Sequence, residues 1–181
     1  EDENYVLDEV LIPALDKVGN KYDKGELFLP QMIQSAETVK IALNIIKDRL
    51  SNNNSSSKGK IIVATVQGDI HDIGKNIVKM MLENYGYEVI DLGKDVPIEE
   101  VVKRAKEENI ELIGLSALMT TTVENMKKTI EALKENDISA KVFVGGAVVT
   151  EEYAEKINAD YYSKDAKSAV EIAKINFKYK I

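Results

Sequence analysis

The only histidine of this chain, His71, lies in the segment Gly68-Asp69-Ile70-His71-Asp72-Ile73-Gly74. Asp69 stands two residues before it, so a carboxylate can bond one ring nitrogen and fix the tautomer of the imidazole. The other ring nitrogen could then act as a general base or as a metal ligand. A structural histidine bonded only to its own loop is the third alternative, and these residues alone leave all three open.

Three familiar site types fit this segment poorly. A P-loop has four residues between its glycines, whereas five separate Gly68 from Gly74, and Asn76 stands where Ser or Thr would hold magnesium. Hydrolysis needs a nucleophile, and Ser116 or Thr122 could serve only if folding brought it to the imidazole. The local sequence does not suggest the strained turn of a nucleophile elbow. A protein-held zinc is disfavoured because the chain has one histidine and no cysteine. A lone histidine suits a metal whose other positions are filled by a macrocycle.

From Lys60 onward, short β-rich runs alternate with helical patterns. Strict alternation of strands and helices predicts a parallel sheet with right-handed crossovers. We therefore expect an α/β fold with a flavodoxin-like (Rossmann-like), doubly wound, five-stranded parallel sheet of order 2-1-3-4-5. The expected strands are residues 60–66, 87–92, 112–116, 142–144 and 160–162, and the expected helices are residues 75–85, 97–108, 122–136, 151–158 and 165–177.

The unusual residues all follow expected strands, at the edge where open α/β sheets bind ligands. The His71 segment follows the first strand. Small and polar residues also follow the third and fourth strands: Ser116, Leu118, Thr120, Thr122, Gly145, Gly146 and Ala147. Because these loops converge on one edge, the sequence predicts a ligand cleft there.

The first 50 residues have apolar side chains at helical spacing. We expect a helix over 4–19 that ends at Gly19-Asn20. Pro13 should either kink this helix or mark its true start. A second helix is expected from Pro30 to residue 50. Two helices cannot form a stable domain alone, and their abrupt start makes us expect a truncated part of a larger bundle. We expect a partial helical-bundle cap over 1–50, a polar linker over 51–59 and a Rossmann-like domain over 60–181.

Composition narrows the function classes. The 181 residues carry a net charge of −7 with a pI near 4.9, which disfavours nucleic acid as a partner. No apolar run approaches the roughly 20 residues that a membrane span requires. The absence of cysteine fits a reducing compartment. We therefore expect a cytoplasmic protein with no nucleic-acid and no membrane partner.

The pattern Asp69-x-His71-x-x-Gly74, with Ser116-x-Leu118 and Gly145-Gly146 downstream, resembles the signature of cobalamin-binding domains. The stretches VATVQGDIHDIGKNIV, DLGKDVP, GLSALMTTT and VGGAVVT are similar to the corrinoid-binding region of cobalamin-dependent methionine synthase. KGELFLPQMIQSAETVK, within residues 1–50, is similar to the helical cap that precedes that region. The resemblance thus spans essentially the whole chain and implies that residues 60–181 bind cobalamin.

This resemblance implies roles for individual residues. His71 would be the lower axial cobalt ligand and Asp69 its hydrogen-bond partner, with the relay continuing to Thr122, where the family usually has serine. Gly74 would permit the turn that opens the pocket. Tyr22, where phenylalanine is usual, and Leu29 would cover the upper, methyl-bearing face. The implied cofactor-contacting residues of the Rossmann-like domain are Gly68, Asp69, Ile70, His71, Asp72, Ile73, Gly74, Ser116, Leu118, Thr120, Thr122, Gly145, Gly146 and Ala147.

The resemblance also implies an activity. The chain would be the methyl-carrier module of methionine synthase, moving a methyl group on cobalamin (as methylcobalamin) from methyltetrahydrofolate to homocysteine. His71 would leave the cobalt on reduction and rebind on methylation, while the Asp69–His71 pair exchanges a proton. This fragment of a methyltransferase would not be catalytically complete, and its partners would be folate-, homocysteine- and activation domains. Zinc is expected only in those other domains.

Several alternatives share parts of the pattern. A stand-alone corrinoid protein that serves separate methanol, methylamine or aryl-ether methyltransferase subunits would have the same cap, fold and motif. The B12 domain of an adenosylcobalamin mutase typically lacks the cap. A non-catalytic B12-binding sensor would need a DNA-binding segment that is not in this sequence. A flavodoxin-like domain without cobalamin is the alternative from another class.

Overall fold

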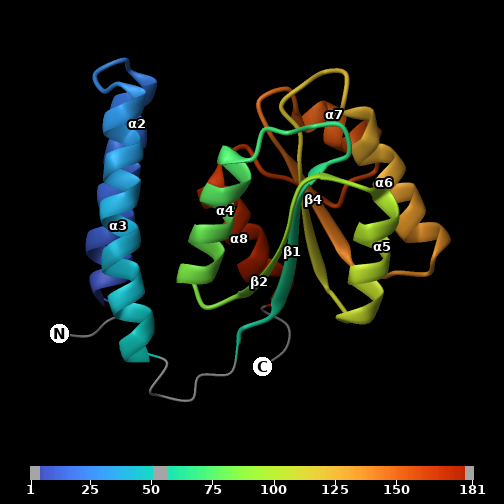
Figure 1. Cartoon of the computed structure of the whole chain (residues 1–181), viewed down its shortest axis with the longest axis horizontal. Coiled ribbons are helices and arrows are strands. Elements are labelled where there is room, and N and C mark those ends of the chain that lie inside the picture. Colours follow the sequence, from blue (N-terminus) through green and yellow to red (C-terminus); the bar gives the residue numbers. More distant parts are fainter. Residues whose placement is uncertain (1–4, 51–56, 178–181) are drawn as a thin grey trace. The chain divides into compact units, whose positions relative to one another are not determined.

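A computed structural model describes residues 5–50 and 57–177 (Figure 1). The chain divides into two compact units, residues 1–56 and residues 57–181, and each unit is described by itself. Most of the polar segment expected as a linker, residues 51–56, lies outside the described residues. None of the helices in the described part of the chain combines the length and apolar character that a bilayer span would need.

The first unit contains a short π-helical segment, Val6–Leu11, followed by α2 (Ile12–Asp23) and α3 (Leu29–Leu50), which pack against each other. Pro13 is the second residue of α2 and follows the π-helical segment closely, so the bonding pattern changes beside a residue that has no N–H to donate. The expected stop at Gly19-Asn20 is wrong, because α2 continues through both residues. The helix ends instead before Gly25, whose φ of +72° matches the left-handed position that commonly terminates a helix.

The second unit is a five-stranded parallel sheet of order β2-β1-β3-β4-β5, which confirms the expected fold class. Each strand is followed by a helix, and the order reverses between β1 and β3. The carboxyl ends of these two strands therefore flank the switch point. The strands are β1 (Lys60–Val66), β2 (Glu88–Val96), β3 (Leu112–Ser116), β4 (Lys141–Gly145) and β5 (Tyr161–Tyr162). The helices are α4 (Ile73–Asn84), α5 (Ile98–Glu107), α6 (Glu124–Glu135), α7 (Glu151–Lys156) and α8 (Ala166–Phe177).

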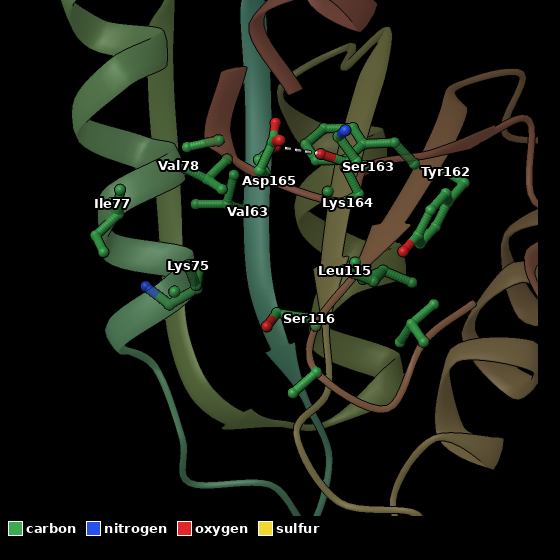
Figure 2. Close-up of a pocket in the computed structure, with 18 residues that line it drawn as sticks. Val63, Lys75, Ile77, Val78, Leu115, Ser116, Tyr162, Ser163, Lys164 and Asp165 are labelled. Carbon is green, nitrogen blue, oxygen red and sulfur yellow. Dashed lines mark hydrogen bonds between the residues drawn. The ribbon is translucent and has the colours of Figure 1, made fainter. Parts of the chain in front are cut away.

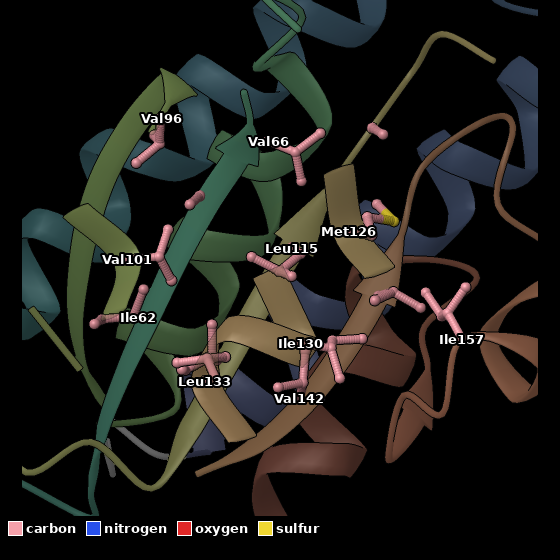
Figure 3. Packing of buried hydrophobic residues seen from close by; sticks show 14 of the residues in the cluster. Ile62, Val66, Val96, Val101, Leu115, Met126, Ile130, Leu133, Val142 and Ile157 are labelled. Carbon is pink, nitrogen blue, oxygen red and sulfur yellow. The ribbon is translucent and has the colours of Figure 1, made fainter. Parts of the chain in front are cut away.

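Helices cover both faces of this sheet and create two hydrophobic clusters. On one face, residues of α5, α6 and α7, such as Met126 of α6, pack against alternate residues of the central strands, such as Ile62 and Leu115 (Figure 3). On the other face, α4 and α8 pack against Ile61 and Leu112. The central strands are thus buried on both sides, which explains their continuous apolar sequence. The site residues lie on loops held by this rigid core.

Strand β2 runs further than the sequence indicated. It was expected to end at residue 92, yet it continues to Val96. Its pairing with β1 shifts register after Asp91 and again before Val96, as β-bulges do. Gly93 and Asp95 adopt φ values of +92° and +51°, so residues that resemble a turn in the sequence are accommodated within the strand. The end of β2 thereby reaches the loop that follows β1.

Gly114 leaves room in β3 for the buried ring of Phe143 on β4, because a Cβ at residue 114 would collide with that ring. We expect Gly114→Ala to lower the free energy of unfolding by about 1–3 kcal/mol through overpacking, measured by urea denaturation. Gly74→Ala is the matched control, since nothing lies within 4 Å of its added Cβ. A Gly114→Ala variant as stable as the wild type would contradict this packing.

Candidate functional site

The loop between β1 and α4 turns sharply so that Asp69 points into the protein. Gly68 supplies the turn with a φ of +85°, and the Asp69 N–H donates to the carbonyl of Val66 at 3.0 Å. Asp69 is completely buried, whereas the side chain of His71 is 44% exposed. The same loop therefore presents one residue to the interior and the other to the surface.

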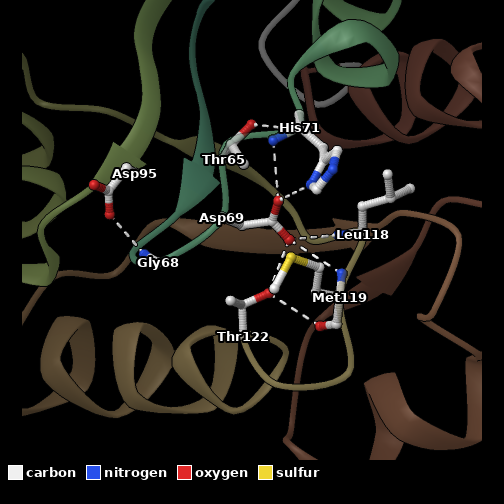
Figure 4. A network of polar contacts seen from close by, with 8 residues as sticks. All are labelled: Thr65, Gly68, Asp69, His71, Asp95, Leu118, Met119 and Thr122. Carbon is white, nitrogen blue, oxygen red and sulfur yellow. Dashed lines mark hydrogen bonds and ion pairs between the residues drawn. The ribbon is translucent and has the colours of Figure 1, made fainter.

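The Asp69 carboxylate accepts five hydrogen bonds from two loops (Figure 4). Oδ1 accepts from the backbone N–H of His71 at 3.0 Å and lies 2.8 Å from His71 Nδ1. Oδ2 accepts from Thr122 Oγ1 at 2.8 Å and from the backbone N–H groups of Leu118 and Met119 at 2.8 and 3.1 Å. The loop after β1 and the loop after β3 thus meet at one carboxylate.

The hydrogen bonds keep Asp69 ionised although it is buried. Burial raises the pKa of this carboxyl group, but the N–H groups of His71 and Leu118, the His71 ring and the Thr122 hydroxyl together hold its pKa well below the usual range. Because an ionised carboxylate accepts and never donates, the proton in the Asp69–His71 bond belongs to Nδ1. In the neutral imidazole, Nε2 then carries the lone pair that a general base or a metal ligand needs.

The surroundings of His71 favour a large apolar ligand. The described residues contain no group of three or more His, Cys, Asp or Glu side chains that could hold a metal ion. A metal at Nε2 would therefore have to bring its other ligands. Four large apolar side chains on or directly beside the two loops that meet at Asp69 are exposed to solvent. Such exposure is typical of a surface that a ligand or partner covers. The exposed fractions are 62% for Ile70, 65% for Ile73, 42% for Leu118 and 38% for Met119.

A cavity of about 400 Å³ opens at the carboxyl edge of the sheet, beside the first turn of α4 (Figure 2). Its floor is apolar, from Val63, Leu115 and Val78, and polar groups come from Ser116 and Asp165. Its size suits part of an organic ligand. Five of the residues expected at the cofactor line it: Gly74, Ser116, Gly145, Gly146 and Ala147.

The glycines of the site differ from their expected roles. Gly74 does not make a turn, because it is the second residue of α4 and has no positive φ. Gly68 makes the turn instead. A Cβ on Gly145 would lie 2.6 Å from the carbonyl oxygen of Ser163, and one on Gly146 would collide with the carbonyl of Ala117. These two glycines are therefore required by the chain's own packing, whereas Gly74 leaves open space beside the cavity.

Other expected residues are not among those that form the polar network or line the cavity. Thr120 is exposed on the loop after β3, and Asp72 precedes α4 without a side-chain capping bond. Tyr22 and Leu29 belong to the first unit, where Tyr22 is 38% exposed at the end of α2 and Leu29 is the first residue of α3. The cavity and the Asp69 network in the second unit are therefore formed without these residues.

Sequence reasoning missed two groups of cavity residues. The loop after β5 contributes Ser163, Lys164 and Asp165, and the rule that ligands bind beyond strand ends could have found it. Lys75 was missed because a lysine in a helix normally faces solvent. Here its side chain is 2% exposed, and its Nζ lies 2.6 Å from Asp91 of β2. Burial raises the pKa of Asp91, but Lys75, the Gly93 N–H and Lys79 together bring the pKa of this carboxyl group below its ordinary value.

Comparison with known proteins gives two family matches. Models described as B12 binding domain match residues 59–172 and residues 3–47. Dimethylamine corrinoid protein 1 of Methanosarcina acetivorans is 43% identical over 176 residues, covering 96% of this chain and 83% of that protein.

Two solved structures show the same architecture. A cobalamin-binding protein from Desulfitobacterium hafniense has a TM-score of 0.75 at 36% identity, covering 96% of this chain and 90% of that chain. A chain in the methanol:cobalamin methyltransferase complex of Methanosarcina barkeri has a TM-score of 0.72 at 33% identity, covering 99% and 69%. The expected resemblance to cobalamin-binding domains is confirmed, but these proteins give no support to methionine synthase in particular.

The buried carboxylate makes a prediction about stability and pH. At pH 7 we expect Asp69→Asn to lower the free energy of unfolding by roughly 2–3 kcal/mol, because an amide NH₂ would face donors in place of an accepting oxygen. The native pKa of Asp69 lies below its unfolded value of about 3.9. Its contribution is therefore fully present above that pH and is lost as the pH falls towards the native pKa.

Urea denaturation of both proteins from about pH 7 to about pH 2 measures this difference, and the wild type should lose more stability on acidification than Asp69→Asn. Asp72→Asn is the control, because that carboxylate makes no capping bond, and it should cost much less. Equal stability of the wild type and Asp69→Asn at pH 7 would show that the five-donor arrangement is wrong.

Proposed function

This chain belongs to the B12-binding domain family, and on that premise we propose that it is the corrinoid-carrying protein of a methyl-transfer system whose methyltransferase is a separate subunit. The observation that carries this function is the buried Asp69, which aligns His71 from the loop after β1 and Thr122 from the loop after β3. In this role the chain holds and presents a cofactor and needs a partner for catalysis.

The residues of the site fit a corrinoid in three respects. His71 Nε2, on a side chain that is 44% exposed, could bind a cobalt whose other ligands come from the corrin. The exposed side chains of Ile70, Ile73 and Leu118 offer apolar contacts to a flat macrocycle. The nearby cavity, lined by Gly74 and Ser116, could take a detached nucleotide tail.

In this role Asp69, His71 and Thr122 control the proton of the site. When bound, the corrinoid supplies a cobalt that accepts and gives up a methyl group. Asp69 keeps the proton of His71 on Nδ1, which maintains Nε2 as a ligand atom and raises its basicity. The hydroxyl of Thr122 donates to the other oxygen of Asp69. Hydrogen bonds therefore connect the imidazole of His71, through Asp69, to the Thr122 hydroxyl, and a change in the charge of the imidazole alters the strength of both bonds.

The methyl donor is proposed from the relatives, which are named as dimethylamine corrinoid proteins and as part of a methanol:cobalamin methyltransferase complex. We therefore favour a methylamine or methanol over the methyltetrahydrofolate of methionine synthase. The proposal retains residues 1–50 as a cap, 51–59 as a linker and 60–181 as the cobalamin-binding domain. Within the cap, Tyr22 and Leu29 would shield the methyl-bearing face of the cofactor.

Because His71 is the only histidine in the sequence, histidine labelled with ¹⁵N reports on it alone. We expect untagged protein loaded with cobalt(II) cobalamin to show nitrogen hyperfine splitting in its electron paramagnetic resonance spectrum, changing from a triplet to a doublet pattern on ¹⁵N-histidine labelling. His71→Ala should remove this label-dependent splitting. A labelled wild type whose splitting still comes from ¹⁴N would show that another base binds the cobalt.

The choice of methyl donor has its own test. Cobalamin-loaded protein, with its cobalt reduced to cobalt(I) by a chemical reductant, is mixed with methyltransferases specific for dimethylamine, monomethylamine, methanol or methyltetrahydrofolate, each with its own methyl donor. Methylation of the bound cofactor is followed by its absorbance. We expect one of the first three to react at least about tenfold faster than the folate enzyme, because productive docking is specific. Reaction only with the folate enzyme would contradict the proposed methyl donor and would support a methionine synthase-like role.

A further inference from the structure

Asp95 has an unusual backbone conformation for a residue within a strand. Four non-glycine residues in the described part of the chain have positive φ: Asp95, Asn109, Asp137 and Asn158. The last three each directly follow the C-cap of a helix, where a left-handed residue is ordinary. Asp95 instead lies inside β2, with a φ of +51°. A left-handed residue at such a position persists only when its surroundings impose it.

The contacts of Asp95 show what it holds in place. Its Oδ1 accepts a hydrogen bond from the backbone N–H of Gly68 at 2.6 Å (Figure 4). Its own N–H donates to the carbonyl of Asp69 at 2.9 Å. These two hydrogen bonds fix the backbone on both sides of the peptide that joins Gly68 to Asp69. From α6, Asn125 Nδ2 donates to the carbonyl of Gln67 at 2.7 Å and supports the preceding residue.

The two hydrogen bonds of Asp95 fix the part of the loop that orients His71. Gly68 has a left-handed φ of +85°, and its lack of a side chain leaves the loop many alternative conformations. Asp69 follows immediately, and its carboxylate is the only group to which the described structure bonds the His71 ring. A carboxylate that accepts from a backbone N–H makes a stronger bond than a neutral group would. Asp95 is therefore placed to select the loop conformation in which Asp69 can align the imidazole.

We propose that Asp95 is a positioning residue for His71, acting from β2 through Gly68 and Asp69. This inference rests on the proposed role of His71 as an axial ligand, and it adds a residue from a third strand to the site. A purely structural turn would make a different prediction, because its loss would lower stability without changing how His71 binds the cobalt.

Three variants separate the carboxylate from the backbone conformation. Asp95→Gly accepts the positive φ at no steric cost and removes the acceptor. Asp95→Asn keeps an Oδ1 acceptor and tolerates the left-handed conformation. Asp137→Gly is the matched control, since Asp137 has the same residue type and a φ of +56° at the end of α6. All three are made in the full chain.

Two measurements are made on each protein. Hydrogen exchange of the Gly68 amide, followed by nuclear magnetic resonance without cofactor, reports directly on the bond to Asp95. Electron paramagnetic resonance of the ¹⁵N-histidine-labelled protein loaded with cobalt(II) cobalamin gives the ratio of His71-coordinated to uncoordinated cobalt.

We expect a protected Gly68 amide in the wild type and in Asp95→Asn, and a freely exchanging one in Asp95→Gly. Asp95→Gly should also lower the ratio of coordinated to uncoordinated cobalt by about three- to tenfold, the effect of one lost hydrogen bond to a charged group in an exposed loop. Asp95→Asn should stay close to the wild type in this ratio, and Asp137→Gly should match the wild type in both measurements.

The proposal is overturned by an unprotected Gly68 amide in the wild type, which needs no variant to be observed. It is also overturned if Asp95→Gly keeps the wild-type coordination ratio, or if Asp95→Asn fails as completely as Asp95→Gly. Failure of the wild type to take up cobalamin would instead refute the proposed function, and the Gly68 amide would then still decide whether Asp95 holds the loop.

Discussion

The carboxylate of Asp69 is removed from water completely, and its burial is offset by five hydrogen bonds that two separate loops supply. A buried carboxylate without such donors would cost several kcal/mol or lose its charge. The loops after β1 and β3 must therefore come together in one arrangement for the fold to be stable. That arrangement also fixes the tautomer and direction of the His71 imidazole, so stability and ligand presentation depend on the same interaction.

The rest of the sheet edge is shaped by close approaches of backbone to backbone. Gly145 and Gly146 let the loop after β4 lie against the carbonyls of Ser163 and Ala117, which brings the ends of β3, β4 and β5 around one cavity. Gly74 is different, because it faces open space within a helix. Packing within the chain does not require a glycine at this position. Its missing side chain leaves room for a ligand in the adjacent cavity.

Much of this could be read from the sequence. Alternating apolar and helical runs gave the sheet order, and the rule that ligands bind beyond strand ends selected the loops of His71, Ser116 and Gly145. The contacts of Asp69 with His71 and Thr122 were expected from the resemblance to cobalamin-binding domains. A pattern so widely shared did not distinguish methionine synthase from corrinoid proteins of other methyltransferase systems, and comparison with relatives was needed for that.

The remaining features depend on tertiary contacts that periodicity does not encode. Strand β5 was expected, but Ser163, Lys164 and Asp165 after it were missed because such residues are ordinary in any loop. Lys75 looks like a surface residue until Asp91 is placed beside it by the pairing of β2 with β1. The extension of β2 to Asp95 was hidden because Gly93 and Asp95 are residues typical of turns, although here they lie in a bulged strand.

The most direct test of the central assignment is a crystal structure of the protein with cobalamin bound. The assignment predicts a bond from His71 Nε2 to the cobalt, Asp69 still bonded to Nδ1, and the nucleotide tail inserted beside Gly74 and Ser116. A cobalt that keeps its own nucleotide base as lower ligand, with His71 turned away and the cavity free of the tail, would contradict it.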